Sequence, residues 1–307
     1  MVKQMEHDFK IIDYIIKGNE THDGAGVKLK RIFGGPNTVQ LTDPFLLLDH
    51  FGSDCIEDYI AGFPWHPHRG IETITYLLSG KVEHRDSTDH RGTIYPDELQ
   101  WMTAGSGIFH EEMPKPLDEK NPEELIKAYG MPTLVSGFQL WLNLPAKYKM
   151  STPAYRSIKG SEVPKIEIDG ATLKIIAGEY NKVSGMYNSQ YGIDPLYLDI
   201  TMDEDSDFVY RVKDGYTSLI FSITGEGISN GQKLEPDTAA IMSRNGNFIK
   251  IHTGNSKYRF ILLSGKPLNE PIKWYGPIVM NTDEQIREAI SDLNNNNFVR
   301  EKNPIVE

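Results

Sequence analysis

Short apolar runs recur along the chain and end at turn-forming residues, and this pattern constrains the fold more than any other feature. The runs are rich in Ile, Leu, Val, Thr or Tyr and stop near Gly, Asp or Asn, as strands of an antiparallel sandwich or barrel do. No alternation with long helices is found, which argues against a parallel α/β sheet. The sequence therefore predicts an all-β protein. The clearest runs are Ile71–Leu78, Leu173–Ala177, Leu196–Thr201, Ser218–Ile223 and Tyr258–Leu263.

One helix is predicted, near the C-terminus. Thr282 is a capping residue and Gln285 lies three positions later, which is the spacing of a capping box. Asp283 and Glu284 suit the positive end of the helix dipole. Apolar residues then recur at helical spacing, so we expect this short helix to pack on the outside of a barrel. They are Ile286, Ala289, Ile290 and Leu293.

The length of 307 residues is enough for two domains that each bury a core. The segment Pro145–Pro164 is polar and contains three prolines, and we interpret it as the connection between two β-rich halves. This predicts domains over residues 1–145 and 146–307. An apolar run closes at Leu78-Ser79-Gly80 and another at Thr224-Gly225, which is a weak indication of a repeated barrel.

Composition and charge exclude several classes of protein. Apolar residues make up 39% and charged residues 24%, as in globular proteins. The net charge of −11 argues against binding to nucleic acid or to an anionic membrane. Cys55 is the single cysteine, so no intrachain disulfide can form. The N-terminus lacks the apolar core of a signal peptide, and no run reaches the ~18 apolar residues of a membrane span. We expect a soluble, cytoplasmic protein.

The histidines are distributed unevenly, since eight of the nine precede residue 111. His66 and His68 are two residues apart, so both side chains point to the same face of a strand. His110 and Glu112 repeat this spacing. On neighbouring strands, the two pairs would bring together three imidazoles and one carboxylate, which predicts a metal site.

Other roles for these residue types stay open. A single His-x-His pair is weak evidence, because a histidine on a strand is usually a packed or hydrogen-bonded residue. Glu72 shares the face of His66 and His68 and could be a ligand or could orient an imidazole. We expect His84 and His90, near Asp86 and Asp89, to lie in a solvated hairpin loop. Trp65 and Trp101 could line a pocket, but core packing is the default.

Two long motifs resemble the pirin family of the cupin superfamily. One is FPWHPHRGIETITYLL at residues 63–78, and the other is DELQWMTAGSGIFHEEMP at residues 97–114. The resemblance extends outward to DPFLLLD at 43–49, QLWLNLP at 139–145, Glu270-Pro271, and GPIVMNT at 276–282. It therefore spans most of the chain and is strongest over residues 43–145.

The resemblance implies a bicupin, with two β-barrels and a metal only in the N-terminal one. It places His66, His68, His110 and Glu112 at the ligand positions, leaves Glu72 outside them, and implies Fe(II). The scarcity of histidine after residue 111 agrees with a second barrel without metal. Three imidazoles and a carboxylate suit Fe(II), and also Mn, Co, Ni or Cu.

The family resemblance implies a reaction like that of quercetin 2,3-dioxygenase, in which O₂ opens the central ring of a flavonol and carbon monoxide is released. Glu112 could then accept the proton of the flavonol hydroxyl if it loosens from the metal. The alternative is a redox-sensitive, iron-binding regulatory protein that acts through protein partners. A third possibility is isomerisation or another oxygenation at the same metal, since cupin folds support many reactions.

Overall fold

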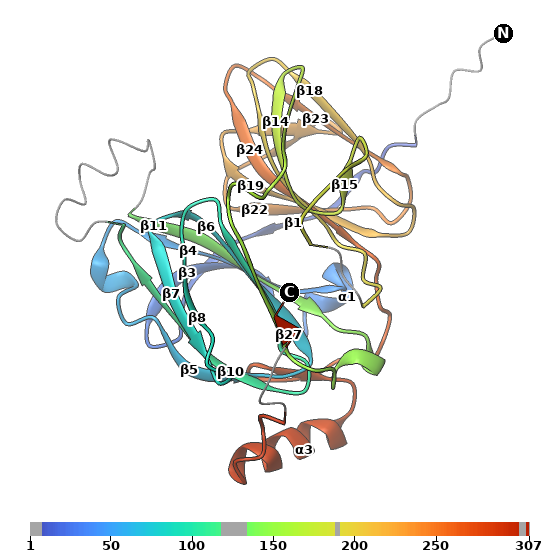
Figure 1. Ribbon diagram of the computed structural model, residues 1–307. Coiled ribbons are helices and arrows are strands. Elements are labelled where there is room, and N and C mark those ends of the chain that lie inside the picture. The colour runs from blue at the N-terminus through green and yellow to red at the C-terminus, as the bar shows by residue number, and fades with distance from the viewer. Residues whose placement is uncertain (1–7, 118–133, 188–190, 301–304, 307) are drawn as a thin grey trace. The chain divides into compact units, whose positions relative to one another are not determined.

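The structure is a computed structural model that describes residues 8–117, 134–187 and 191–300 and the backbone of residues 305–306 (Figure 1). The chain forms two compact units, and both are built of strands. The larger unit comprises residues 19–39, 45–162 and 269–307, and the smaller unit comprises residues 1–18, 40–44 and 163–268. The all-β prediction is confirmed.

The larger unit contains two sheets with an apolar core between them. Val82 and Ile94 of one sheet pack in a single cluster with Leu29, Leu77 and Val135 of the other. The eight-stranded sheet has the order β2 (Asn19–Asp23), β3 (Val27–Gly34), β4 (Phe45–Ser53), β11 (Val135–Asn143), β6 (Ile71–Ser79), β9 (Leu99–Thr103), β12 (Ala154–Ile158) and β27 (Ile305–Val306). The four-stranded sheet has the order β5 (Phe63–His68), β10 (Ile108–Lys115), β7 (Lys81–Asp86) and β8 (Arg91–Ile94). A hairpin of β25 (Lys273–Tyr275) and β26 (Ile278–Met280) completes the strands of this unit.

The smaller unit repeats this plan. Phe208, Ile249 and Ile251 of its shorter sheet pack against Leu198 and Phe260 of its longer sheet. The longer sheet has the order β1 (Ile12–Lys17), β22 (Thr238–Met242), β19 (Thr217–Thr224), β24 (Tyr258–Gly265), β17 (Leu196–Met202), β14 (Ala171–Ala177) and β13 (Lys165–Ile168). The shorter sheet has the order β18 (Asp207–Arg211), β23 (Phe248–Thr253), β20 (Gly227–Ser229) and β21 (Gln232–Leu234), and β15 (Glu179–Tyr180) pairs with β16 (Val183–Ser184).

Helices are few and short in the described part of the chain. The predicted C-terminal helix is confirmed as α3 (Asp283–Asn294), with Thr282 as its N-cap and a capping box to Gln285. Its Ala289 is fully buried. The others are α1 (Val39–Thr42) and the 3₁₀ turns η1 (Ile56–Asp58) and η2 (Ala146–Tyr148). Among the described residues, no helix is both long and apolar enough to cross a membrane.

The units differ from the predicted division after residue 145. Strand β1 pairs with β22 and so belongs to the smaller unit, whereas residues 269–307, including α3, belong to the larger unit. The segment Pro145–Pro164 contains the boundary between the units, but not all of it is connection. Its residues 154–158 form β12, which pairs antiparallel with β9 because Tyr155 and Ile158 are apolar and buried. The chain enters the smaller unit only after residue 162.

Candidate metal centre

Strands β5 and β10 place the three predicted histidine ligands side by side. His110 of β10 pairs with His66 of β5, and the pairing continues with Ile108 and His68. The turn after β5 requires glycine at position 70, where φ is 79°. A side chain there would place its Cβ 2.1 Å from the carbonyl oxygen of Val279. Gly70 therefore allows the turn after His68 to lie against the backbone of β26.

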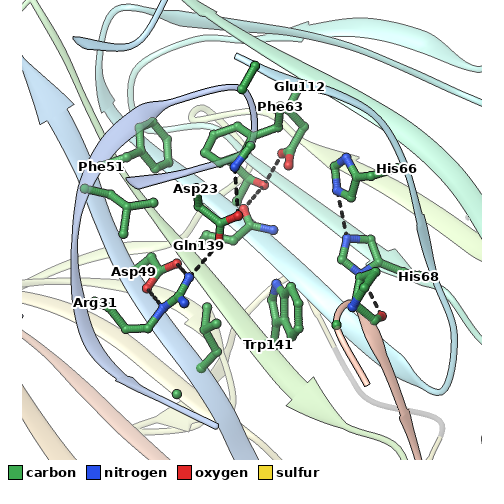
Figure 2. Close-up of a pocket in the computed structure, with 18 of the residues that line it drawn as sticks. Asp23, Arg31, Asp49, Phe51, Phe63, His66, His68, Glu112, Gln139 and Trp141 are labelled. Carbon is green, nitrogen blue, oxygen red and sulfur yellow. Dashed lines mark hydrogen bonds and ion pairs between the residues drawn. The ribbon is translucent and has the colours of Figure 1, made fainter. Parts of the chain in front are cut away.

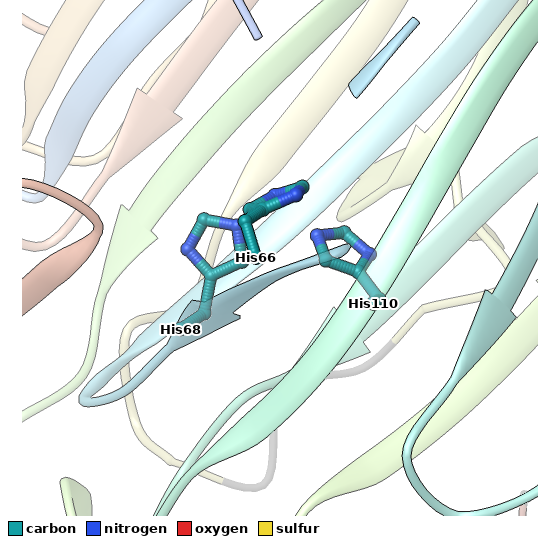
Figure 3. Close-up of side chains that lie close together, drawn as sticks. All are labelled: His66, His68 and His110. Atoms are coloured by element: carbon teal, nitrogen blue, oxygen red, sulfur yellow. The ribbon is translucent and has the colours of Figure 1, made fainter. Parts of the chain in front are cut away.

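His66, His68 and His110 form one compact group (Figure 3). Their potential ligand nitrogens all lie within 4.8 Å of one another. The ring centroids are 4.4 Å apart for His66 and His110, 4.8 Å for His66 and His68, and 5.0 Å for His68 and His110. His68 and His110 are buried, and His66 is partly exposed.

Hydrogen bonds to backbone carbonyls determine the tautomers of two of these rings. Nδ1 of His66 is 2.9 Å from the carbonyl oxygen of Pro64, and Nδ1 of His68 is 3.2 Å from that of Pro277. A carbonyl only accepts, so each Nδ1 carries the proton and each neutral ring has a lone pair on Nε2. The two Nε2 atoms are 3.0 Å apart. Two facing lone pairs at this distance repel each other, and a cation between them removes the repulsion.

The ring of His110 is also available to bind a cation. Both ring nitrogens of His110 are buried and have no hydrogen-bond partner among the described residues. Burial lowers the pKa of His66, and it lowers the pKa values of His68 and His110 well below the usual 6.5. The three imidazoles are therefore neutral at physiological pH, as metal ligands must be. Their arrangement fits a divalent transition metal.

Glu112 lies on the same face of β10 as His110 but does not join the group. The alternating burial of β10 puts both side chains inside, as the spacing predicts. Oε1 of Glu112 accepts a hydrogen bond of 2.7 Å from the hydroxyl of Thr75. Burial raises the pKa of Glu112 to about 7. The structure thus brings together three of the four predicted ligands, whereas the fourth, Glu112, is hydrogen-bonded to Thr75 of β6.

Glu72 lies apart from the three histidines. It is fully buried on β6, and its Oε1 accepts a hydrogen bond of 2.7 Å from the hydroxyl of Thr103. The possibility that Glu72 is a metal ligand receives no support from this arrangement.

His66, His68 and Glu112 line a pocket of about 650 Å³ in the larger unit (Figure 2). This is an ordinary volume for a small-molecule site. Aromatic rings supply much of its wall, and a polar cluster supplies another part. The aromatic residues are Phe51, Phe63, Trp65, Trp141 and Trp274, and the polar residues include Asp23, Arg31, Asp49, Thr75 and Gln139.

Except for Trp65, none of these lining residues was predicted from the sequence to be part of a site. Arg31 lies on β3, and its side chain borders the pocket. Strand alternation predicts the face on which Thr75 and Gln139 each lie. It does not show that their strands are neighbours, which places the two side chains together. Trp65 is half-exposed and stacks on Phe109 with centroids 6.1 Å apart, whereas Trp101 is a core residue.

The prediction of a solvated hairpin around His84 is wrong for His84 and Asp86. Both side chains are buried, because they alternate with exposed residues on β7. Nε2 of His84 is 2.7 Å from the hydroxyl of Tyr155, and burial lowers the pKa of His84 to about 4. His84 is therefore a neutral, packed histidine.

Comparisons with known proteins agree with the sequence motifs. Residues 26–142 match the family model Pirin, and residues 197–299 match the model Pirin C-terminal cupin domain. The protein of Thermoplasma acidophilum named "Putative quercetin 2,3-dioxygenase Ta0133" is 47% identical over 264 residues, which cover 83% of this chain and 99% of that protein. Human Pirin is 37% identical over 302 residues, which cover 95% of this chain and 96% of that protein.

A crystal structure of quercetin 2,3-dioxygenase from Acinetobacter baumannii superimposes on this chain with a TM-score of 0.83 and 34% identity. The match covers 94% of this chain and 98% of that one. The predicted cupin fold and the predicted family are thus confirmed. The chain belongs to the pirin family.

Proposed function

We propose that this chain is a metal-dependent dioxygenase that opens the central ring of flavonols such as quercetin. The observation that carries the proposal is a pocket of about 650 Å³ with aromatic walls, whose lining includes His66 and His68 with their Nε2 atoms 3.0 Å apart. The names of the relatives from T. acidophilum and A. baumannii support the same reaction.

We assign the metal to His66, His68 and His110, with Glu112 as the fourth ligand when its side chain turns away from Thr75. Fe(II) is the ion we propose, and Mn, Co, Ni or Cu accept the same ligands. When bound, the metal would bring a flavonol and O₂ together and acidify the flavonol hydroxyl.

The residues of the pocket would bind the flavonol and accept the proton of its hydroxyl. Trp141 and Trp274 stack with centroids 5.9 Å apart and offer a flat apolar wall to an aromatic ligand. Glu112, in the position where Thr75 holds it, faces the pocket and would accept the flavonol hydroxyl proton. Its raised pKa makes this carboxylate a stronger base than an exposed one.

Turnover tests the proposal directly. The protein is loaded with Fe(II) under nitrogen, quercetin is added, and air is admitted. We expect loss of the flavonol absorbance with release of carbon monoxide. A fully metallated protein that leaves quercetin intact would contradict the assignment as a flavonol dioxygenase.

Metal content tests the ligand assignment separately. His110→Ala removes one of three nitrogen ligands, so we expect the variant to lose most of its metal during dialysis against a weak chelator. His252→Ala is the matched control, because His252 is a partly exposed histidine of the smaller unit that pairs with Asp207 at 3.1 Å. Equal metal content in the two variants, with both folded by circular dichroism, would show that the site is assigned wrongly.

A further inference from the structure

The pocket has a second polar end, formed by Asp23, Arg31 and Asp49 (Figure 2). Arg31 of β3 forms a two-point hydrogen bond with Asp49 of β4, from Nε at 2.9 Å and from Nη2 at 2.8 Å. Nη2 also donates to Asp23 of β2 at 2.7 Å. In Figure 2 this cluster lies across the pocket from His66 and His68. We call it the distal cluster.

The distal cluster is anionic and can form further hydrogen bonds with a ligand. One guanidinium between two carboxylates leaves a formal charge of −1. Asp49 is buried, but the side chains of Asp23 and Arg31 are 52% and 33% exposed. Nη1 of Arg31 has no hydrogen bond to the residues that the structure describes. A ligand would therefore meet carboxylate acceptors on Asp23 and a donor on Arg31.

A hydroxylated, uncharged aromatic ring fits both features. A phenolic hydroxyl donates to a carboxylate and accepts from a guanidinium, so it can use both groups at once. A sulfate or carboxylate on the ring would be repelled by the net negative charge. A ring without hydroxyls would displace water from these polar groups without forming hydrogen bonds in its place.

We propose that the distal cluster binds the ring hydroxyls at the end of the substrate remote from the metal, and that it excludes substrates with an anionic group at that end. This assignment rests on the proposed flavonol function, since it places the chelating end of the substrate at the histidines. It defines the substrate class as neutral polyphenols.

The Arg–Asp pair alone would not support this assignment. The smaller unit contains a similar pair, in which Arg259 contacts Asp199 at 3.0 and 2.7 Å, so such a pair also serves to join strands. The distal cluster differs because a second carboxylate, Asp23, joins the guanidinium at the wall of a pocket. Asp23 is thus the residue to test.

Binding of three flavonols under nitrogen provides the test. The dissociation constants of 3-hydroxyflavone, quercetin and quercetin 3′-sulfate are measured on the metal-loaded protein by quenching of tryptophan fluorescence, since Trp65, Trp141 and Trp274 line the pocket. The variants are Asp23→Ala, which removes the acceptor, and Asp23→Asn, which keeps a hydrogen-bonding side chain but removes the charge. Asp203→Asn is the matched control, because Asp203 is a half-exposed carboxylate that pairs with Lys257 in the smaller unit.

We expect the preference for quercetin over 3-hydroxyflavone to fall about fivefold or more in Asp23→Ala, as for loss of a partly exposed charged hydrogen bond. We expect the discrimination against the sulfate to fall about three- to tenfold in Asp23→Asn, and Asp203→Asn to behave as the wild type. Unchanged ratios in both Asp23 variants would overturn the proposal.

The same assay separates this proposal from the proposed function. Graded binding without turnover in air would retain the distal cluster as a polyphenol site and reject the dioxygenase. Turnover with unchanged ratios would retain the dioxygenase and reject the distal cluster. Failure of all three flavonols to bind would reject both.

Discussion

The Thr75 hydroxyl lies 2.7 Å from Oε1 of Glu112 and 2.7 Å from Oε1 of Gln139, yet it has one proton to donate. When Glu112 is ionised, Thr75 donates to the carboxylate, and the Gln139 amide must turn its nitrogen toward the hydroxyl oxygen. The three side chains then form a chain of donors that ends on Glu112. This chain holds the carboxylate beside the histidines without placing it among them.

Removal of the hydroxyl tests this role of Thr75. In Thr75→Val the carboxylate of Glu112 loses its donor, so we expect flavonol turnover to fall about tenfold, the loss that a hydrogen bond to a charged group implies. Metal content should not fall, because none of the three histidines is hydrogen-bonded to Thr75 in the described structure. Thr75→Ser, which restores the hydroxyl, should recover most of the activity. Wild-type turnover in Thr75→Val would show that Glu112 does not depend on Thr75.

The sequence could predict the faces of these side chains but not their partners. The spacing of two residues placed His66 with His68 and Glu112 with His110 on common faces, and the burial pattern of β10 agrees. The partner of the Glu112 carboxylate depends on β6, which supplies Thr75 from 37 positions earlier. Neighbouring strands are established only by folding, so a strand pattern cannot identify such a contact.

At the scale of elements, a buried lysine joins the turn that follows His68 to the C-terminal hairpin. Lys149 is fully buried just after η2, and its Nζ donates to the carbonyl oxygens of Gly70 and Val279 at 2.8 and 2.9 Å and to Oδ1 of Asn143 at 2.6 Å. All three protons of the ammonium group are thus used. The same hairpin supplies the carbonyl of Pro277 that orients His68.

Lys149→Met should therefore weaken both the fold and the metal site. Loss of three buried hydrogen bonds to acceptors that remain should lower the free energy of unfolding by about 3 kcal/mol. Metal affinity should fall with it, because His68 loses a fixed orientation. Lys147→Met is the control, since Lys147 is exposed in η2 and lies over the ring of Tyr148. Denaturant unfolding and metal titration measure both effects, and a Lys149→Met protein as stable as Lys147→Met would contradict this account.

Helix α3 is attached to the same turn by an ion-pair network. Asp292 of α3 accepts hydrogen bonds of 2.8 Å from Arg69 and from Arg300. The guanidinium of Arg69 is buried and lies 4.2 Å from the ring centroid of Phe298. Burial alone would raise the pKa of Asp292, but the hydrogen bonds from the two arginines outweigh it and lower the pKa below the usual 3.8.

This pKa shift predicts how the contribution of Asp292 depends on pH. A carboxylate with a lowered folded-state pKa stabilises the fold above the unfolded value of 3.8, and the stabilisation is lost as the pH falls below it. Asp292→Asn should lower the unfolding free energy by about 1–2 kcal/mol at pH 7, and the difference from the wild type should shrink below pH 3.8. Asp283→Asn, at an exposed ion pair of the same helix, should cost less. A difference that stays constant from pH 7 to pH 3 would contradict the shift.

The local sequence pattern is sufficient to predict α3 but not β12. The capping box of α3 involves residues three positions apart, Thr282 and Gln285, and needs no tertiary partner. Strand β12 is five residues long, lies among prolines, and becomes a strand only because β9 offers an edge to it. Such a short strand is stabilised by its neighbour, and its own sequence pattern is too brief to reveal it.

At the scale of the molecule, the chain does not divide at a single point. Ile12 of β1 pairs with Met242 of β22, and residues 269–307 return to the larger unit after the smaller one is complete. Pairing between residues so far apart in sequence leaves no composition shift at a boundary. The sequence could therefore predict two β units and the metal motif in one of them, but not which chain ends complete each unit.

The metal should accordingly act on one unit only. A ligand that binds only the folded state stabilises it by about 2.7 kcal/mol when the free ligand concentration is about a hundred times the dissociation constant. The exchange rate of amides that exchange when the site opens should then fall by up to about a hundredfold. Hydrogen–deuterium exchange with and without metal should show this protection in β5 and β10, which supply His66, His68 and His110. Peptides of β17 and β24 should exchange at the same rate in both samples, because their side chains belong to a separate core in the smaller unit. His110→Ala exposed to the same metal supplies the control, in which β5 and β10 should lose the protection. Equal protection of β17 and β24 would place the metal, or its effect on stability, outside the three histidines.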